Sequence, residues 1–189
     1  MTNFFLTISE FDLLINETIA RSRTPFQDLF FGFFTQVGHW FVIFILLVIF
    51  VAIFLSRNRV YPVIVGGVCV LGAGATTVIL KSVISRPRPD PSLALRVEDF
   101  ASMPSGHATL VMALFISVIY FCLKSSLTIL NKIVVVALSV LIILLVGYSR
   151  LYLGVHYLSD VLAGYLVVLI WLGLAVWFAE SAKKRASSQ

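Results

Sequence analysis

The sequence predicts an all-α integral membrane protein, and three observations lead to this fold class. Of its 189 residues, 60% are hydrophobic and only 12% are charged, whereas soluble domains carry about 25% charged residues. Five apolar runs are each long enough to cross a bilayer as a helix, and charged residues gather between them. Because so apolar a surface must face lipid, we expect a bundle of five to six transmembrane helices.

The five expected spans have lengths that suit the hydrocarbon core of a bilayer, and they cover approximately residues 38–55, 60–80, 106–123, 133–149 and 159–178. Before the first span, the aromatic stretch 26–37 is too short to cross alone and predicts a tilted helix leading into it. A sixth full span therefore stays open.

The N-terminal segment 7–22 predicts an amphipathic helix in the plane of the membrane interface. Its apolar residues recur at helical spacing on one face, with charges on the other; they are Ile8, Phe11, Leu14, Ile15 and Ile19. Pro25 is expected to end this helix.

We expect one membrane-embedded domain over residues 1–189, made of an interfacial helix (1–25), a helical core (26–178) and a basic cytoplasmic tail (179–189). The two cysteines, Cys69 and Cys122, lie inside apolar runs and predict buried free thiols.

The net charge of +5 is explained by membrane orientation, so no nucleic-acid partner is expected. Alternating spans place seven basic residues on each membrane face, which leaves the count tied. Three of those on the face of the long loop 82–105 are assigned to a site below: Lys81, Arg88 and Arg150. Without them, the positive-inside rule predicts a multi-pass protein of the inner (plasma) membrane with this loop on the periplasmic face.

Three polar clusters fall on that same face, at Lys81–Pro89, Pro104–His107 and Ser149–Asp160. In the third, His156 and Asp160 are four residues apart and share one face if a helix begins just before His156. A carboxylate that accepts from one ring nitrogen leaves the other nitrogen free as a nucleophile. The alternative is a structural His–Asp pair at a helix start.

In the second cluster, Ser105 is a natural N-cap and Gly106 lets the backbone approach a ligand closely. Amides at a helix start bind anions, and His107 is placed to donate a proton to a leaving oxygen. The alternative is a helix cap with an interfacial histidine.

In the first cluster, Lys81, Arg86 and Arg88 surround a turn stiffened by prolines, and Arg150 adds a further cation. Guanidinium groups match phosphate oxygens in a bidentate way. Anchors that extend from a span's end toward the interface are the alternative. Together, the three clusters predict a phosphate site with a nucleophile and a proton donor.

These residues closely resemble the signature of the type-2 phosphatidic acid phosphatase family, which shares its catalytic core with vanadium haloperoxidases. Three motifs carry the resemblance: K-x6-R-P at Lys81 and Arg88-Pro89, P-S-G-H at 104–107, and S-R-x5-H-x3-D at Ser149-Arg150, His156 and Asp160. The first spacing selects Arg88 over Arg86. The resemblance extends from about residue 26 to 178 and implies a bundle of about six helices.

The resemblance also implies a role for each matched residue. His156 is similar to the nucleophile that forms a phosphohistidine, Asp160 to its orienting partner, and His107 to the acid that protonates the leaving group. The implied phosphate-binding set is Lys81, Arg88, Ser105, Gly106 and Arg150. Family members work without a metal or other cofactor, and the sequence offers no metal motif.

The expected activity is hydrolysis of a lipid phosphate or diphosphate at the membrane surface, with membrane lipids as the surroundings. Phosphatidic acid, phosphatidylglycerophosphate and undecaprenyl diphosphate stay open as substrates, and so does the oligomeric state. The remaining charged residues of this face are candidates for head-group selection: Arg86, Arg96, Glu98 and Asp99. A lipid phosphotransferase is one alternative. An anion transporter is another, disfavoured because the charges cluster at one face instead of mid-membrane.

Overall fold

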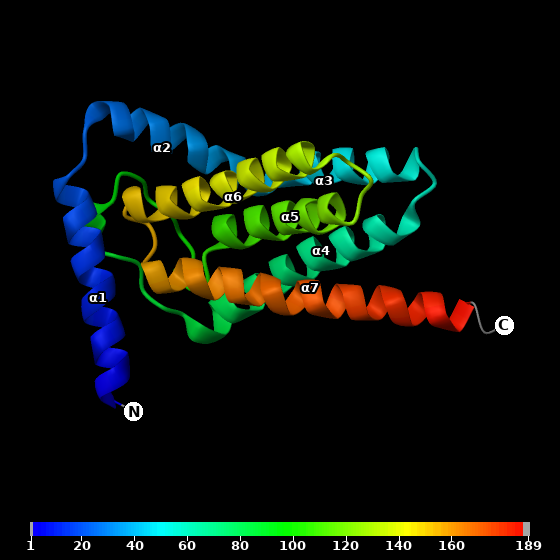
Figure 1. Cartoon of the computed structure of the whole chain (residues 1–189). Coiled ribbons are helices and arrows are strands. Elements are labelled where there is room, and N and C mark those ends of the chain that lie inside the picture. Colours follow the sequence, from blue (N-terminus) through cyan, green and yellow to red (C-terminus); the bar gives the residue numbers. More distant parts are fainter. Residues whose placement is uncertain (1, 187–189) are drawn as a thin grey trace.

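The computed structural model describes residues 2–186, with side chains described for residues 7–185. Within residues 2–186 the chain forms seven α-helices and one short 3₁₀ turn, and no strand (Figure 1): α1 (Thr2–Arg21), α2 (Pro25–Val37), α3 (Trp40–Leu55), α4 (Val60–Ile84), η1 (Pro91–Leu93), α5 (Gly106–Leu123), α6 (Ile129–Tyr152) and α7 (Leu158–Ala186). The predicted all-α fold class is confirmed.

The helices α3 to α7 run alongside one another as a bundle (Figure 1). Four of them, α4 to α7, are each long and apolar enough to cross a membrane, and α2 with α3 forms a fifth candidate span bent by 49° at its break. The described residues therefore hold four to five candidate spans, which reaches the predicted five to six only if the bent pair counts as one span. The expectation that 26–37 leads into the first span agrees with this bent pair.

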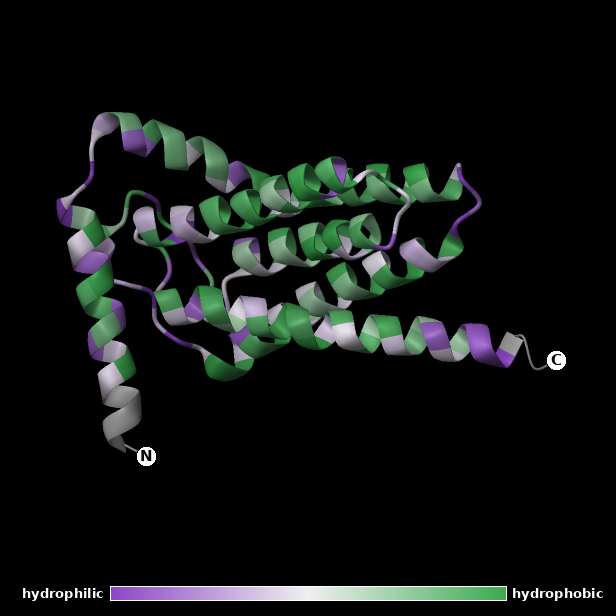
Figure 2. Cartoon of the chain, in the orientation of Figure 1, coloured by the Kyte–Doolittle hydropathy of each residue, from purple (hydrophilic) through white to green (hydrophobic). Residues whose placement is uncertain are grey.

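The outer faces of the bundle are apolar along most of its length, as Figure 2 shows. On α6 and α7, Leu144, Leu166 and Ile170 are 57%, 60% and 56% exposed. Exposing so much apolar surface to water is unfavourable, because each Å² of apolar surface removed from water stabilises the protein by about 25 cal/mol. A bilayer supplies the missing apolar surroundings, and the chain is a membrane protein.

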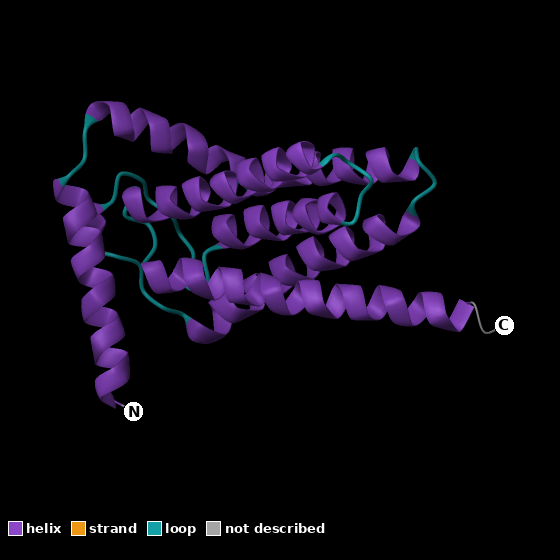
Figure 3. Cartoon of the chain, viewed as in Figure 1, coloured by secondary structure: helices purple, strands orange, loops and turns teal. Residues whose placement is uncertain are grey.

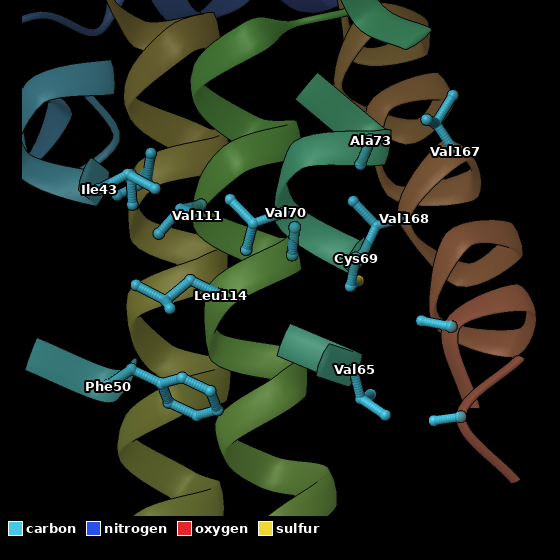
Figure 4. Close-up of a cluster of buried hydrophobic side chains, with 14 residues drawn as sticks. Ile43, Phe50, Val65, Cys69, Val70, Ala73, Val111, Leu114, Val167 and Val168 are labelled. Atoms are coloured by element: carbon cyan, nitrogen blue, oxygen red, sulfur yellow. The ribbon is translucent and has the colours of Figure 1, made fainter. Parts of the chain in front are cut away.

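The core lies where α3, α4, α5 and α7 meet (Figure 4). Val65, Cys69 and Ala73 of α4 are fully buried and pack with Val111 of α5 and Val168 of α7. Small side chains at such contacts allow transmembrane helices to approach closely. Cys69 is a buried free thiol, as the sequence predicts, and Cys122 is another.

Helix α1 runs across the end of the bundle where α4 and α6 end and α5 and α7 begin (Figure 1). Ile15 and Ile19 pack on this end, while Phe11 and Leu14 are more than half exposed. The predicted helix is therefore present, but it ends at Arg21, and Pro25 begins α2 instead. The prediction that its charges lie opposite the packed face is wrong for Asp12, which is 1% exposed and pairs with the half-buried Arg86 at 2.9 Å.

The connection between α4 and α5 is the long loop predicted from its proline and charge content (Figure 3). It is fixed to the same end of the bundle as α1. The Leu95 N–H donates to the Leu153 carbonyl at 2.9 Å, and the Arg23 guanidinium donates to the carbonyls of Leu93 and Tyr152. The loop is thus held over the ends of α6 and α7.

Candidate active site

The three sequence motifs meet at the end of the bundle that α1 crosses. A cavity of about 720 Å³ opens there, between the end of α4 and the start of α5. Five of the eight predicted site residues line it: Lys81, Arg88, Gly106, His107 and His156. The other three are buried close behind it: Ser105, Arg150 and Asp160. The structure therefore brings together all the residues that the motifs select.

His156 and Asp160 form the predicted pair, but not on one helical face. Helix α7 begins at Leu158, after His156, so the pair is closed by a turn in which the Tyr157 N–H donates to Asp160 Oδ2 at 2.9 Å. His156 Nδ1 lies 3.4 Å from the same oxygen, and both residues are buried. With the Nδ1 proton directed at Asp160, Nε2 carries the free lone pair. This nitrogen lies 3.5 Å from an Arg88 nitrogen, in the cavity wall.

Burial sets the protonation of this imidazole. It lowers the pKa of His156 to about 4, although the Asp160 carboxylate acts in the opposite direction. A neutral imidazole is the nucleophilic form, so His156 is ready to attack at neutral pH.

The turn that returns the chain from α6 to His156 depends on Gly154. Its φ of +70° is in the left-handed region, where a Cβ is disfavoured. A Cβ at this position would also lie 3.0 Å from the Ala94 Cα of the long loop. Glycine therefore allows the loop to lie directly against the nucleophile segment.

His107 enters the cavity from the first turn of α5. Ser105 occupies the N-cap position, as predicted, but its side chain makes no capping hydrogen bond, and its buried Oγ has no partner among the described residues. The Ser105 N–H instead donates to the Asp160 carbonyl at 3.0 Å. The start of α5 is thus fixed to the start of α7, which keeps both histidines at one cavity.

The cations predicted to bind phosphate surround the same space. Arg88 donates to the carbonyls of Phe100 and Val155, each at 2.6 Å. Arg150 is 1% exposed, donates to Thr35 Oγ1 at 2.6 Å, and keeps its Nε without a partner among the described residues. Lys81 is held by the carbonyls of Ala101 and Ser102. These contacts, to backbone carbonyls for Arg88 and Lys81 and to a side chain for Arg150, fix the cations in place before a ligand binds.

Glu98 is part of this cluster, although the motifs give it no role. Its carboxylate pairs with Arg88 at 3.2 Å and with Arg150. Burial opposes ionisation, yet the charges of Arg150 and Arg88 lower the pKa of Glu98 to about 2. Asp99 also lines the cavity, so the three cations with these two carboxylates leave a net charge of +1, a sign that suits a phosphate anion. The only sequence signal for Glu98 was its position in the long loop.

Arg86, which the motif spacing sets aside, also contacts the site. Its guanidinium donates to Asp160 Oδ1 at 2.7 Å and to Asp12 Oδ2 of α1 at 2.9 Å. No sequence signal connected the N-terminal helix with the nucleophile, because the pairing joins residues far apart in the chain.

Within the described residues, no group of three or more His, Cys, Asp or Glu side chains is placed to hold a metal ion. The positive charge that the described side chains supply to the cavity comes from lysine and arginine.

Comparison with known proteins gives a consistent set of relatives. The chain matches the PAP2 superfamily over residues 62–184. It is 37% identical over 108 residues to phosphatidylglycerophosphatase B of Bacillus subtilis, an alignment that covers 56% of this chain and 52% of that protein. The chain therefore matches about half the length of this curated relative.

Two crystal structures share the fold. The PAP2 type phosphatidylglycerolphosphate phosphatase from Bacillus subtilis superposes with a TM-score of 0.78 at 28% identity, covering 93% of this chain and 87% of that one. Aquifex aeolicus LpxE superposes with a TM-score of 0.70 at 27% identity, covering 88% of this chain and 94% of that one.

Proposed function

Because the chain belongs to the PAP2 superfamily, we propose that it is an integral membrane phosphatase that hydrolyses a lipid phosphate or diphosphate. One observation carries the proposal: the Nε2 of a buried, neutral histidine lies 3.5 Å from Arg88 in a cavity lined by fixed cations. A nucleophile beside a preorganised cationic cluster is the arrangement that phosphoryl transfer requires.

In the first step, His156 Nε2 attacks phosphorus while the bond from phosphorus to the lipid oxygen breaks. His107 gives its proton to that oxygen, so the lipid leaves as an alcohol, or as a lipid monophosphate if the substrate is a diphosphate. Asp160 accepts the Nδ1 proton of His156 in a hydrogen bond and stabilises the positive charge that develops on the ring.

In the second step, water attacks the phosphohistidine and gives its proton to His107. The bond between phosphorus and Nε2 breaks, inorganic phosphate leaves, and both histidines return to their starting forms. Throughout, Lys81, Arg88 and Arg150 neutralise the phosphoryl oxygens, assisted by the amides at the start of α5. General acid and base catalysis by a histidine in the place of His107 increases the reaction rate about 10²- to 10⁴-fold.

The cavity wall supports a lipid as the substrate. Beside the cations it is lined by Trp40, Val78 and Leu110, and the first two are 64% and 69% exposed on the outside of the bundle. An acyl or prenyl chain can therefore lie along this apolar wall while its phosphate reaches the cations. Phosphatidylglycerophosphate is the first substrate to test, given the names of the Bacillus subtilis relatives.

We also propose that residues 1–189 act as one domain with the site on the periplasmic side of the inner membrane. The contacts of α1 and of the long loop with α6 and α7 support a single unit, and the basic tail supports a cytoplasmic C-terminus.

The experiment is a substrate panel with purified protein: phosphatidic acid, phosphatidylglycerophosphate and undecaprenyl diphosphate, scored by released phosphate with and without EDTA. We expect release from at least one lipid, little effect of EDTA, and loss of release in His156→Ala and His107→Ala. Full activity in either folded variant would contradict the mechanism. Phosphorylated acceptor lipid in place of free phosphate would indicate a phosphotransferase, and phosphate flux without hydrolysis in proteoliposomes would indicate a transporter.

A further inference from the structure

Helix α1 contacts the nucleophile segment through two buried polar side chains one helical turn apart. Asp12 and Asn16 are 1% and 3% exposed. Asn16 donates its amide to the His156 carbonyl at 3.4 Å. Burying a polar group on an otherwise apolar contact face is unfavourable unless the group forms hydrogen bonds. Asp12 and Asn16 are therefore expected to have specific partners.

Arg86 connects α1 with the catalytic pair. One guanidinium nitrogen lies 2.7 Å from Asp160 Oδ1, and the other lies 2.9 Å from Asp12 Oδ2. The Tyr157 ring lies against the guanidinium at 4.1 Å and restricts it from a third side. One cation thus links a carboxylate of α1 to the carboxylate behind His156.

Asp12 also holds the first turn of α7 directly. It accepts from the Ser159 N–H at 3.1 Å and from the Ser159 hydroxyl. The first amides of a helix have no partner within the helix and favour a negative charge nearby. Because Ser159 precedes Asp160, Asp12 fixes the backbone that carries the orienting carboxylate.

The two oxygens of Asp160 therefore have separate partners. Oδ2 faces His156 Nδ1 and the Tyr157 N–H, and Oδ1 faces Arg86. Asp160 is fully buried, and a buried carboxylate whose cation is removed is strongly disfavoured. Without Arg86, the carboxylate would be free to rotate away from the histidine or to take up a proton.

We propose that Asp12 and Arg86 are positioning residues that hold the Asp160 carboxylate toward His156, which makes α1 part of the catalytic unit. The inference rests on the proposed function, because it assigns the geometry that the nucleophile requires. Neither residue touches the phosphate: Arg86 and Asp12 do not line the cavity.

The kinetic test uses full-length protein in detergent micelles with dioctanoyl phosphatidic acid. Asp12→Asn and Arg86→Gln are each expected to lower kcat about 10- to 100-fold, the effect typical of partners that orient a reacting group, with KM nearly unchanged. The double variant is expected to lose less than the product of the single losses, because both residues act on one carboxylate. Arg86→Lys is expected to recover part of kcat, since it keeps the charge but cannot bridge two carboxylates.

The matched control is the exposed pair on the same helix. Glu17 and Arg21 are 3.1 Å apart, with side chains 51% and 81% exposed. Glu17→Gln and Arg21→Gln make the same charge changes without touching the site, and wild-type kcat is expected for both.

A second readout separates positioning from mere structural support. Histidine NMR titration is expected to show the pKa of His156 moving down in both Arg86→Gln and Asp12→Asn, because an Asp160 carboxylate that rotates away or takes up a proton no longer stabilises the imidazolium. The other charged or titratable groups around His156 stay the same in all variants: Arg150 of α6, Arg88 and Glu98 of the loop, His107 of α5 and Lys81 of α4. If Arg86 acted on His156 through its charge alone, removing it would raise this pKa, so a downward shift in Arg86→Gln identifies loss of the Asp160 position.

Unchanged kcat in both variants, a change confined to KM, or a His156 pKa that stays fixed or rises in Arg86→Gln would each overturn the inference. If Arg86→Gln does not fold, Asp12→Asn decides the matter, because asparagine still accepts from Ser159. The titration does not depend on turnover. Downward shifts in both variants of a protein that releases no phosphate from any tested lipid would therefore overturn the proposed function and leave the positioning role in place.

Discussion

Lowering the pH is expected to protonate His156 only well below the range in which a solvent-exposed histidine titrates. Burial lowers its pKa from the ordinary 6.5 to about 4. At about 1.36 kcal/mol per pH unit, this difference corresponds to about 3 kcal/mol against the imidazolium in the resting protein. At neutral pH, roughly one molecule in a thousand would carry a protonated His156.

The same two pKa values determine how the free energy of unfolding changes with pH. Between about pH 6.5 and 4 the unfolded chain binds a proton at this position and the folded chain does not. The contribution of His156 to the free energy of unfolding is therefore fully present above about pH 6.5. It decreases by up to about 3 kcal/mol as the pH falls to about 4.

The assay is NMR of histidine-labelled protein in micelles. The chain has three histidines, so a His156→Gln variant identifies the signal. We expect this signal to stay constant down to about pH 5 and to shift only near the lowered pKa, whereas the denatured protein titrates near the ordinary value. A folded-state midpoint near 6.5 would refute the reasoning that burial keeps the nucleophile neutral.

Glu98→Gln is expected to strengthen inhibition by free phosphate about tenfold, equivalent to about 1.4 kcal/mol. The reason is that a carboxylate no longer competes with phosphate for Arg88 and Arg150. An unchanged inhibition constant would show that Glu98 does not oppose phosphate binding. Arg150→Lys is expected to lower kcat/KM by about 10² to 10³, since an ammonium cannot reproduce the planar contacts with Thr35 and Glu98; steady-state kinetics near the wild-type values would contradict this role. Gly154→Ala is expected to lower the Tm by more than a few degrees, because a left-handed alanine costs about 1–2 kcal/mol and its Cβ would also lie 2.5 Å from the Leu93 carbonyl oxygen. An unchanged thermal unfolding curve would show that the turn relaxes.

The sequence predicted the bundle because membrane spans leave a strong local signal. Uninterrupted apolar runs such as 60–80 and 133–149 mark helices whatever their neighbours are. The helix breaks were harder to predict: α7 begins at Leu158, after His156, and Pro25 starts a helix instead of ending one. Element boundaries depend on turn geometry and tertiary contacts, which apolar periodicity does not encode.

The site was predictable as far as its residues fall into compact motifs. Span alternation alone placed Lys81, His107 and His156 at one end of the bundle, and they line one cavity. Glu98 was predicted only as a candidate for head-group selection, and Asp12 only as part of an amphipathic helix, since each pairs with partners far along the chain. A lone carboxylate in a loop or an amphipathic helix carries no pattern that identifies its partner.

The central claim is that the phosphoryl group passes through His156, and trapping that intermediate tests it most directly. Wild-type protein would be mixed with excess ³²P-labelled lipid phosphate and quenched in alkali, which preserves phosphohistidine. We expect label on the peptide that contains residue 156 in the wild type, and none in His156→Ala. Labelled phosphate released within a single turnover, without any labelled protein, would contradict the claim and indicate direct attack by water.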